Sequence, residues 1–351
     1  MNDLTRFTLR MIALLAIPVA VGVLTYAGIK QLFRVPVNPS STEKVLVEVR
    51  PEKNFRVFSK ELAEKGLIKH WRVLDVLARI RGKDTQIKAG EYELSAAMTP
   101  IEILHKLVAG DVFLRRVTVK EGTSIREIGK LLESAGLTSA NEFDRAIYAT
   151  PLLYKAGINA ESFEGYLYPE TYNFSRTDPV DHIIWRMMEQ GEKQWPDEFT
   201  ARADELNLSR HEILILASVI EKESGNASEA AMISSVFHNR LANGMKLQSD
   251  PTVIYGLKDF DGNLTKADLQ NPHPYNTYVH YGLPPGPICN PGINAIRAAL
   301  YPAETNFLFF VSDGTGKHVF SSTLKEHNEA VRRYQIPGAA ADTNAQPPAA
   351  E

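Results

Sequence analysis

The stretch from Ile213 to Gly225 constrains the fold more than any other part of the sequence. It begins as a continuous apolar run, too dense for a helix with one face in water, and then places two carboxylates and a lysine within one turn. The run predicts a helix buried in a core, and Gly225 indicates where that helix ends. We therefore expect charged side chains at the end of a core helix.

The two carboxylates of this stretch, Glu221 and Glu223, cannot lie on the same face of a helix. At about 100° per residue they point roughly 200° apart, and only Glu223 continues the apolar side of Leu216 and Ile220. Apolar surroundings disfavour the charged form of a carboxyl, so they raise its pKa and allow it to act as a general acid near neutral pH. Glu223 is the predicted buried carboxylate. The alternative is a helix that simply ends in solvated charges.

The composition limits the class of protein. The 351 residues suffice for two domains, and 44% hydrophobic with 23% charged residues is ordinary for a globular protein. A formal net charge of −3 argues against nucleic acid as the main partner. The single cysteine, Cys289, excludes an internal disulfide framework and a cysteine-cluster metal site. Nothing in the sequence requires a metal or a cofactor, and we expect neither.

The N-terminal segment is predicted to cross a membrane once. Residues 11–29 are apolar with two exceptions, which matches the length of a transmembrane helix. The alternative is a cleaved signal peptide, which usually has a shorter apolar core and a small-residue cleavage site; here charged residues follow. We expect an uncleaved anchor over residues 11–33, after a cytoplasmic arm of residues 1–10. The numbers of basic residues before and after the apolar segment are nearly equal, so they do not set its orientation. The placement of the large C-terminal part outside the cytoplasm rests on analogy with other single-pass anchors.

The folded part is predicted to begin after a proline- and serine-containing linker, residues 34–42. Alternation and helical spacing predict strands at 45–49 and 90–94 and helices at 55–67, 71–80 and 99–108. Thr99 is expected to cap the last of these helices, with Glu102 at the third helical position, as in a capping box. These elements form a module of residues 43–115. Such modules commonly bind an extended ligand at an edge or groove, and the alternative is a spacer; both remain open.

The first strand and helix of this module recur later in the chain. The matching positions are Val117 for Val47, Ile128 for Phe58, Leu132 for Leu62 and Gly136 for Gly66. We interpret this as an internal repeat of a strand–helix unit closed by a glycine cap.

The remaining pattern predicts further helices, loops and a tail. We expect helices at 180–194, 230–242 and 290–300, a hairpin at 307–311 and 319–321, loops at 247–256, 275–278 and 282–288, and a disordered tail at 338–351. Long loops rich in Gly and Pro usually line a binding site. The Gln, Asn, Thr and Tyr side chains of these loops are of the types that form hydrogen bonds with sugar hydroxyls. The aromatic segment 163–172 either stacks on sugars or forms a hydrophobic hairpin that packs on the core.

Several catalytic classes do not fit the sequence. No Gly-x-Ser-x-Gly elbow is present for a Ser-His-Asp enzyme, and the histidines lack the helical pairing of a zinc protease. A phosphate-binding loop is also absent from the sequence. A carboxylate among polar and aromatic loops remains, which is the composition of a glycan-cleaving enzyme.

A set of motifs in this order resembles the YceG-like family of endolytic murein transglycosylases. The motifs are Ala217–Ser224, Phe237–Leu241, Leu247–Gly256, Tyr275–Tyr278, Gly282–Ile288 and Asn290–Gly292. The similarity extends from the apolar N-terminal segment to about Tyr334, and a set this long is specific. His238 stands where the family often has an apolar residue, a departure that affects no catalytic role.

The resemblance implies an α+β fold with three parts: a transmembrane helix, a LysM-like module over residues 43–115, and a lysozyme-like helical catalytic domain with β and loop insertions over residues 116–337. It implies that Glu223, in the pair Glu223-Ser224, is the catalytic acid. The candidate substrate-binding residues are Ser224, Gln248, Asp250, Tyr255, Tyr275, Asn276 and Tyr278.

The implied reaction cleaves peptidoglycan between N-acetylmuramic acid and N-acetylglucosamine. Glu223 would protonate the glycosidic oxygen and then, as a carboxylate, take the proton of the muramyl 6-hydroxyl, which attacks the anomeric carbon and forms a 1,6-anhydro end. The alternatives are a muramidase that hydrolyses the bond with two carboxylates, the second being a distant Asp250 or Glu229, and a non-catalytic peptidoglycan-binding protein.

The same resemblance implies a place in the cell. We expect a single-pass protein of the inner membrane whose catalytic domain lies on the periplasmic side and limits the length of nascent glycan strands. Its expected partners are those strands, the membrane, and the peptidoglycan synthases known as penicillin-binding proteins.

Overall fold

The computed structural model describes residue 16 and residues 18–22, 27–28, 30–50, 54–224, 227–258 and 260–335. Within these residues, no helix combines the length and the apolar character that a membrane span requires. The predicted anchor over residues 11–33 falls partly outside them, and the predicted tail, 338–351, lies entirely outside them. Both therefore stay predictions.

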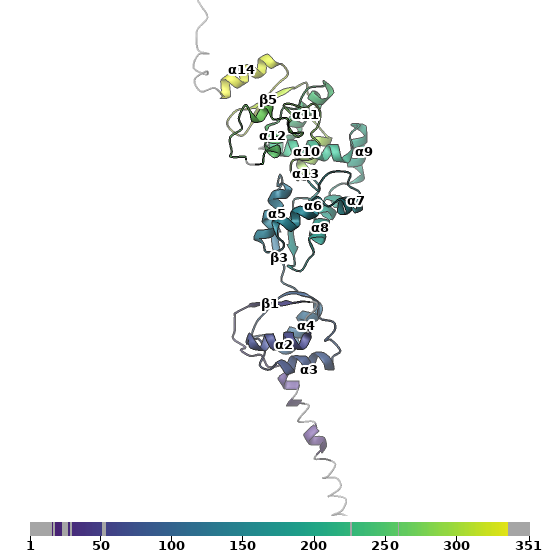
Figure 1. Ribbon diagram of the computed structural model, residues 1–351, viewed down its shortest axis with the longest axis vertical. Coiled ribbons are helices and arrows are strands. Elements are labelled where there is room, and N and C mark those ends of the chain that lie inside the picture. The colour runs from purple at the N-terminus through teal and green to yellow at the C-terminus, as the bar shows by residue number, and fades with distance from the viewer. Residues whose placement is uncertain are drawn as a thin grey trace, which may run out of the picture. The chain divides into compact units, whose positions relative to one another are not determined.

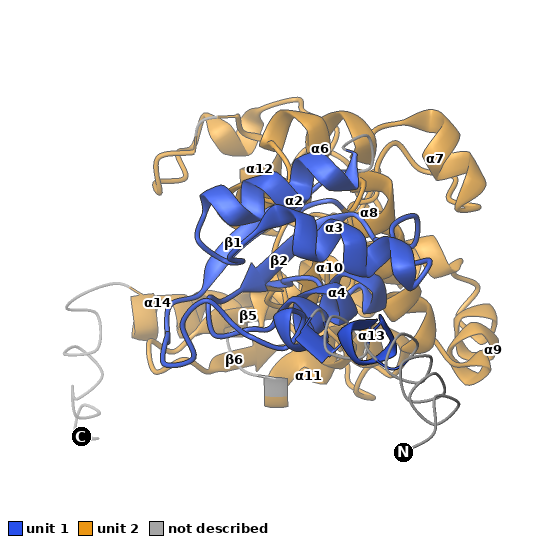
Figure 2. Cartoon of the chain, turned by 90° about the horizontal axis from the view of Figure 1, so that it is seen from below, with its two compact units in different colours: residues 1–115, 175–177 blue, residues 116–174, 178–351 orange. Residues whose placement is uncertain are grey.

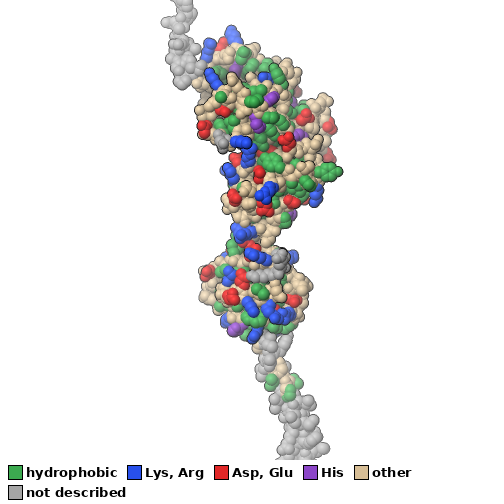
Figure 3. Space-filling view, viewed as in Figure 1, with side chains coloured by type: hydrophobic (Ala, Val, Ile, Leu, Met, Phe, Trp, Pro, Cys, Tyr) green, Lys and Arg blue, Asp and Glu red, His purple; other side chains and the backbone are tan. Residues whose placement is uncertain are grey.

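The chain divides into two compact units, residues 1–115 with 175–177 and residues 116–174 with 178–351 (Figure 2). Helices dominate the described part, which also contains three two-stranded sheets (Figure 1). The α+β class predicted from the sequence is confirmed. On the face drawn in Figure 3, basic and acidic side chains are interspersed.

Between residues 45 and 109, the described part of the first unit forms a two-stranded sheet and three helices. Its elements are β1 (Val45–Val49), α2 (Phe55–Glu64), α3 (Trp71–Ile80), β2 (Gly90–Leu94) and α4 (Pro100–Ala109). The strands are antiparallel, with Val47 opposite Tyr92, and both side chains are buried in the core of this unit. Helix α4 begins with the capping box predicted from its sequence, in which the side chains of Thr99 and Glu102 each bond to the other's backbone N–H.

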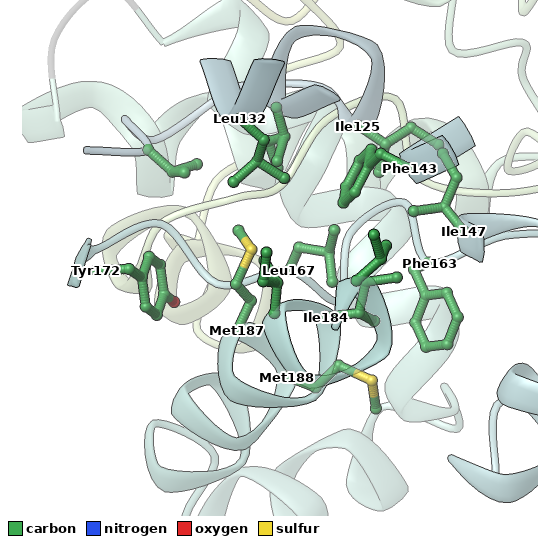
Figure 4. Close-up of a cluster of buried hydrophobic side chains, with 14 of the residues drawn as sticks. Ile125, Leu132, Phe143, Ile147, Phe163, Leu167, Tyr172, Ile184, Met187 and Met188 are labelled. Carbon is green, nitrogen blue, oxygen red and sulfur yellow. The ribbon is translucent and has the colours of Figure 1, made fainter. Parts of the chain in front are cut away.

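The second unit begins with a strand–helix part that has its own core. Its elements are β3 (Arg115–Thr118), α5 (Ile125–Ser134), α6 (Ala140–Ile147), α7 (Thr150–Lys155), β4 (Thr171–Phe174) and α8 (Val180–Lys193). Strand β3 pairs with β4. Figure 4 shows the buried side chains of Leu132, Phe143 and Ile184 in this core.

The internal repeat predicted from the sequence is present in the structure. Gly66 after α2 and Gly136 after α5 have φ angles of 69° and 67°, in the left-handed region that favours glycine. The next residue donates its N–H back into each helix, from Leu67 to Leu62 at 2.9 Å and from Leu137 to Leu132 at 3.0 Å. Both helices thus end with the same glycine cap.

The aromatic segment 163–172 packs on the core and does not form a hairpin. Phe163 and Leu167 are fully buried, and Tyr172 is 5% exposed (Figure 4). The hydroxyl of Tyr172 donates to the carbonyl of Tyr168 at 2.6 Å. Of the two alternatives left open by the sequence, the structure supports core packing for these three side chains.

The rest of the second unit surrounds one buried helix. Its elements are α9 (Asp197–Glu205), α10 (Arg210–Glu223), the 3₁₀ turns η1 (Ala227–Glu229) and η2 (Asp268–Gln270), α11 (Ala230–Ala242), α12 (Asp250–Gly256), α13 (Ile293–Leu300), β5 (Phe309–Ser312), β6 (His318–Ser321) and α14 (Leu324–Gln335). Every residue of α10 from Ile213 to Ile220 is buried, as its apolar run predicts. Helices α9, α11, α12 and α13 contact it.

One loop prediction was wrong. Residues 250–256 form helix α12, although the sequence analysis placed the whole of 247–256 in a loop. Pro251 lies in the first turn of this helix, where its missing N–H would have no helical partner and its fixed φ is already helical. The proline therefore marks the start of a helix here.

Candidate active site

A cavity of about 590 Å³ lies in the second unit at the end of α10. Its walls come from α10, α11, α12, the hairpin β5–β6 and α14, and from two loops. The lining residues are Glu223, Arg240, Leu247, Gln248, Asp250, Tyr278, Phe309, Phe310, Val311, Ser312, His318, Leu324, His327, Asn328, Val331 and Gln335. The cavity therefore combines charged and polar side chains with apolar and aromatic ones, as ligand sites commonly do.

Glu223 is the last residue of α10 and reaches this cavity. Its burial raises the pKa of the carboxyl, and the negative charge of Asp250 acts in the same direction. The hydrogen bond from Ser249 acts oppositely. A carboxyl with a raised pKa at the edge of a cavity can hold a proton and deliver it to a ligand.

Ser249 positions the carboxyl of Glu223. Its hydroxyl donates to Oε1 of Glu223 at 2.6 Å. Ser249 is itself buried and fixed, because its backbone N–H donates to Oγ1 of Thr277 at 3.0 Å and its carbonyl accepts from Oγ1 of Thr252 at 2.6 Å. One oxygen of Glu223 is therefore held by a rigid neighbour.

Asp250 is a second carboxylate in the cavity. The hydroxyl of Tyr278 donates to its Oδ1 at 2.6 Å. Tyr278 is held in turn by Asn276, whose Oδ1 accepts the backbone N–H of Tyr278 at 2.9 Å. Asn276 is fully buried, and its amide nitrogen donates to backbone carbonyls within its own loop, including that of Asn271 at 2.7 Å. Asn276 thus shapes the loop and does not line the cavity.

Arg240 lies in the wall of the cavity and ties two segments together. Its guanidinium donates to the carbonyl of Leu247 at 2.6 Å and to that of Leu308 at 2.7 Å. The neighbouring Gln248 lines the cavity and has a φ of 51°, which is uncommon for a residue other than glycine. Such backbone strain persists where the surroundings impose it, often at functional sites.

The hairpin and the last helix provide aromatic and imidazole side chains. The ring of His327 on α14 stacks on Phe309, with centroids 5.1 Å apart. The ring of His318 on β6 meets Phe310 edge to face, with centroids 5.4 Å apart. These rings form a firm wall on which an apolar sugar face could rest.

Ser224 and Glu221 line a different, smaller cavity of about 140 Å³ together with Glu121. The backbone N–H of Gly292, which precedes α13, donates to Oε2 of Glu221 at 3.1 Å. Burial raises the pKa of Glu221, and the charge of Glu121 contributes to the increase. Glu221 therefore does not share the cavity of Glu223, in line with the opposite faces predicted from their spacing.

Tyr255 and Tyr275 lie outside the lining of the large cavity. Their rings are 4.8 Å apart, and the hydroxyl of Tyr255 donates to Oε2 of Glu164 at 3.1 Å. Burial raises the pKa of Tyr275 to about 12. Both tyrosines thus contribute to a buried polar cluster around Glu164, and neither faces the space beside Glu223.

The structure therefore brings together Glu223, Gln248, Asp250 and Tyr278 from the predicted set, and it places Ser224, Tyr255, Tyr275 and Asn276 elsewhere. Ser249 and Arg240 stand inside the motifs Leu247–Gly256 and Phe237–Leu241, but neither was predicted as a site residue. His318 was also not predicted, because the histidines lack the spacing of a zinc protease.

Among the described residues, no group of three or more His, Cys, Asp or Glu side chains is arranged to hold a metal ion.

Comparison with known proteins identifies the family. A model of the YceG-like family matches residues 47–333. A Bacillus subtilis protein named endolytic murein transglycosylase is 30% identical over 320 residues, which cover 85% of this chain and 87% of that protein. A Streptococcus pneumoniae protein of the same name is 26% identical over 331 residues, covering 85% of this chain and 60% of its own length.

A solved structure also resembles the chain. The crystal structure of a YceG-like protein from Listeria monocytogenes matches with a TM-score of 0.58 and 32% identity, over 82% of this chain and 99% of that one. The family match covers most of the chain, and the Bacillus subtilis relative and the Listeria monocytogenes structure agree with it. The chain belongs to the YceG-like family.

Proposed function

We propose that this protein is a lytic transglycosylase that cleaves peptidoglycan glycan strands internally, between N-acetylmuramic acid and N-acetylglucosamine. The observation that carries the proposal is the placement of Glu223, a carboxyl with a raised pKa, at the edge of a cavity of about 590 Å³. The names of the relatives from Bacillus subtilis and Streptococcus pneumoniae support the substrate class.

In the proposed reaction, protonated Glu223 donates its proton to the glycosidic oxygen as the bond to the anomeric carbon breaks. Ser249 holds Oε1 of Glu223, and we assign the proton transfer to Oε2. The muramyl 6-hydroxyl attacks the anomeric carbon and closes the 1,6-anhydro ring. In the simplest form of the reaction, the Glu223 carboxylate takes up the proton that this hydroxyl loses.

Asp250 supports a second candidate, a muramidase that hydrolyses the same bond. Two carboxylates in one cavity could act as acid and base or as acid and nucleophile. However, Asp250 accepts a hydrogen bond of 2.6 Å from the hydroxyl of Tyr278, which fixes the position of the carboxylate. Such a group can stabilise positive charge at the anomeric carbon without attacking it.

Mass spectrometry of the products separates the candidates. The full chain is incubated with purified peptidoglycan, and the new ends are identified. Transglycosylation gives 1,6-anhydro ends, and hydrolysis gives reducing ends with the mass of one added water. If only reducing ends form, the protein is a muramidase and not a transglycosylase. If no new ends form, only the peptidoglycan-binding function remains.

The anchor and the module complete the proposal. Residues 11–33 hold the protein in the inner membrane with its catalytic part on the periplasmic side, and the module of residues 43–115 is LysM-like. A linker of about ten residues reaches roughly 5–6 Å times the square root of its length, so the enzyme stays near strands that emerge beside the synthases. Recovery of a mature chain that starts after residue 30 would show a cleaved signal peptide instead.

A further inference from the structure

His318 is a cavity residue to which the proposed reaction assigns no role. It begins β6, lines the same cavity as Glu223, and its side chain is 14% exposed. Its Nδ1 lies 2.9 Å from Oε2 of Glu229, the last residue of η1. Glu229 is 17% exposed and is not part of the cavity lining. The pair therefore consists of one ring in the cavity wall and one carboxylate behind it.

Glu229 fixes His318 through two separate groups. Besides its contact with Nδ1, its carboxylate accepts the backbone N–H of His318, with Oε2 at 3.1 Å. The edge-to-face contact with Phe310, at an interplanar angle of 88°, restricts rotation of the ring. The position and orientation of the imidazole are thus set by a charge, a backbone bond and an aromatic neighbour.

This arrangement determines the tautomer of a neutral imidazole. A carboxylate accepts hydrogen bonds, so the ring proton lies on Nδ1 and Nε2 carries the lone pair. Among the described residues, Nε2 of His318 has no hydrogen-bond partner. In other enzymes, a hydroxyl nucleophile is activated by a histidine whose other ring nitrogen is hydrogen-bonded to a carboxylate.

We propose that His318, oriented by Glu229, is the base that accepts the proton of the muramyl 6-hydroxyl in the cleavage reaction. The inference rests on the proposed function and divides its acid and base roles between two residues. Glu223 acts as the acid, His318 acts as the base, and Glu229 is a positioning residue.

The proton balance closes without another reactant. The proton of Glu223 moves to the glycosidic oxygen, and the bond between that oxygen and the anomeric carbon breaks. The 6-oxygen forms the new bond to the anomeric carbon, and its proton moves to Nε2 of His318. After product release, His318 returns that proton to Glu223 directly or through water, which restores both residues.

The surroundings of His318 are compatible with this exchange. The charged or titratable groups that face the cavity with it are Glu223, Asp250, Arg240, Tyr278 and His327, and Glu229 lies behind it. His318 is among the groups that lower the pKa of Glu223, so the two residues are electrostatically coupled. Glu229 and Asp250 stabilise the imidazolium that forms during the step, and Arg240 opposes it.

Two variants distinguish the role of His318 as a base from the role of its hydrogen bond to Glu229. Asparagine in H318N can place an amide N–H near the position of Nδ1 and keep the bond to Glu229, but it has no basic nitrogen toward the cavity. Glutamine in E229Q keeps an oxygen acceptor and removes the charge. Both are tested as full chains, on glycan strands without peptide cross-links, by kcat and KM as functions of pH.

We expect H318N to lower kcat by about 10²-fold, the usual size of a general-base effect, with KM within about threefold and an unchanged melting temperature. E229Q should move the acidic limb of the kcat/KM profile to lower pH, because the negative charge that favours the protonated ring is gone. Residual product from both variants should still carry 1,6-anhydro ends.

The outcomes are distinct from those that test the proposed function. Wild-type kcat in H318N, or an unmoved acidic limb in E229Q, would overturn the inference while anhydro products still support the transglycosylase. If H318N does not fold, the pH position of the acidic limb of the kcat/KM profile in E229Q is the deciding measurement. Reducing ends from the wild-type chain would remove the proposed function and the inference together.

Discussion

Two carboxylates in the second unit, the partly buried Glu223 and the fully buried Glu164, differ in what surrounds them. Burial raises the pKa of both, that of Glu164 to about 8. Glu223 reaches a large cavity and has one oxygen held by Ser249. Glu164 is 1% exposed and is enclosed by protein donors, with no place in the lining of that cavity.

The donors around Glu164 come from three separate segments. The backbone N–H of Ile125 donates to Oε1 at 3.1 Å, the amide of Asn290 donates to the same oxygen at 3.0 Å, and Tyr255 donates to Oε2. This carboxyl joins α5, α12 and the loop before α13. A raised pKa therefore does not by itself identify an acid catalyst; access to a ligand distinguishes Glu223 from Glu164.

The largest expected effect is that of E223Q on activity. Glutamine has nearly the same shape but no proton to donate, so cleavage should fall by about 10³-fold or more. The melting temperature should change little, because Ser249 can still donate to the amide oxygen. Release of soluble fragments from peptidoglycan gives the rate, and thermal unfolding gives the stability.

The matched control is E221Q, two positions away on the same helix and in the smaller cavity. It should retain most of the activity. A reversal, with E221Q inactive and E223Q active, would contradict the assignment of the acid and the comparison built on it.

The next effect is that of E164Q, which should change stability and not the chemical step. The amide nitrogen cannot accept a hydrogen bond, as the hydroxyl oxygen of a protonated carboxyl can, so the free energy of unfolding near pH 5 should fall by about 1–3 kcal/mol. Activity per folded molecule should stay within about twofold. Chemical denaturation and a rate normalised to folded protein are the two measurements.

The pH dependence sharpens the same test. The pKa of Glu164 is raised in the folded state, so its contribution to stability is present at low pH and is lost as pH rises from about 4.5 to about 8. The slope is at most about 1.4 kcal/mol per pH unit in this window. E164Q should lack that contribution, and an identical pH dependence in both chains would show that Glu164 is ionised throughout.

The smallest effect is expected from S249A. Loss of the hydroxyl removes a bond that favours the carboxylate, so the pKa of Glu223 rises further. Because Glu223 must be protonated to act, the alkaline limb of the kcat/KM profile should move to higher pH. The change in maximal rate should stay within about tenfold, and a limb that moves to lower pH would argue against this bond.

Local sequence patterns predicted much of the fold, because periodicity and caps depend on near neighbours. The buried helix α10, the strands β1 and β2 and the capping box of α4 are all in the predicted places. Helix α12 was missed because Pro251 was interpreted as a loop signal, although a proline is equally compatible with a first helical turn.

The candidate site was less predictable, since its members come from segments far apart in the chain. Composition suggested tyrosines and asparagines of the loops as ligand contacts, yet Tyr255 faces Glu164 and Asn276 holds its own loop. Ser249 and Asp250 are adjacent in sequence, and only packing shows that one bonds to Glu223 and the other to Tyr278.

The sequence alone determined that a carboxylate ends a buried helix and that Glu223, not Glu221, continues its apolar face, because the rotation per residue is fixed by backbone geometry. Tertiary structure alone decided which groups surround that carboxylate. Ser249, Arg240 and His318 meet there because α10, α11, α12 and the β5–β6 hairpin pack around one cavity. Such convergence depends on the packing of whole elements, which no local pattern encodes.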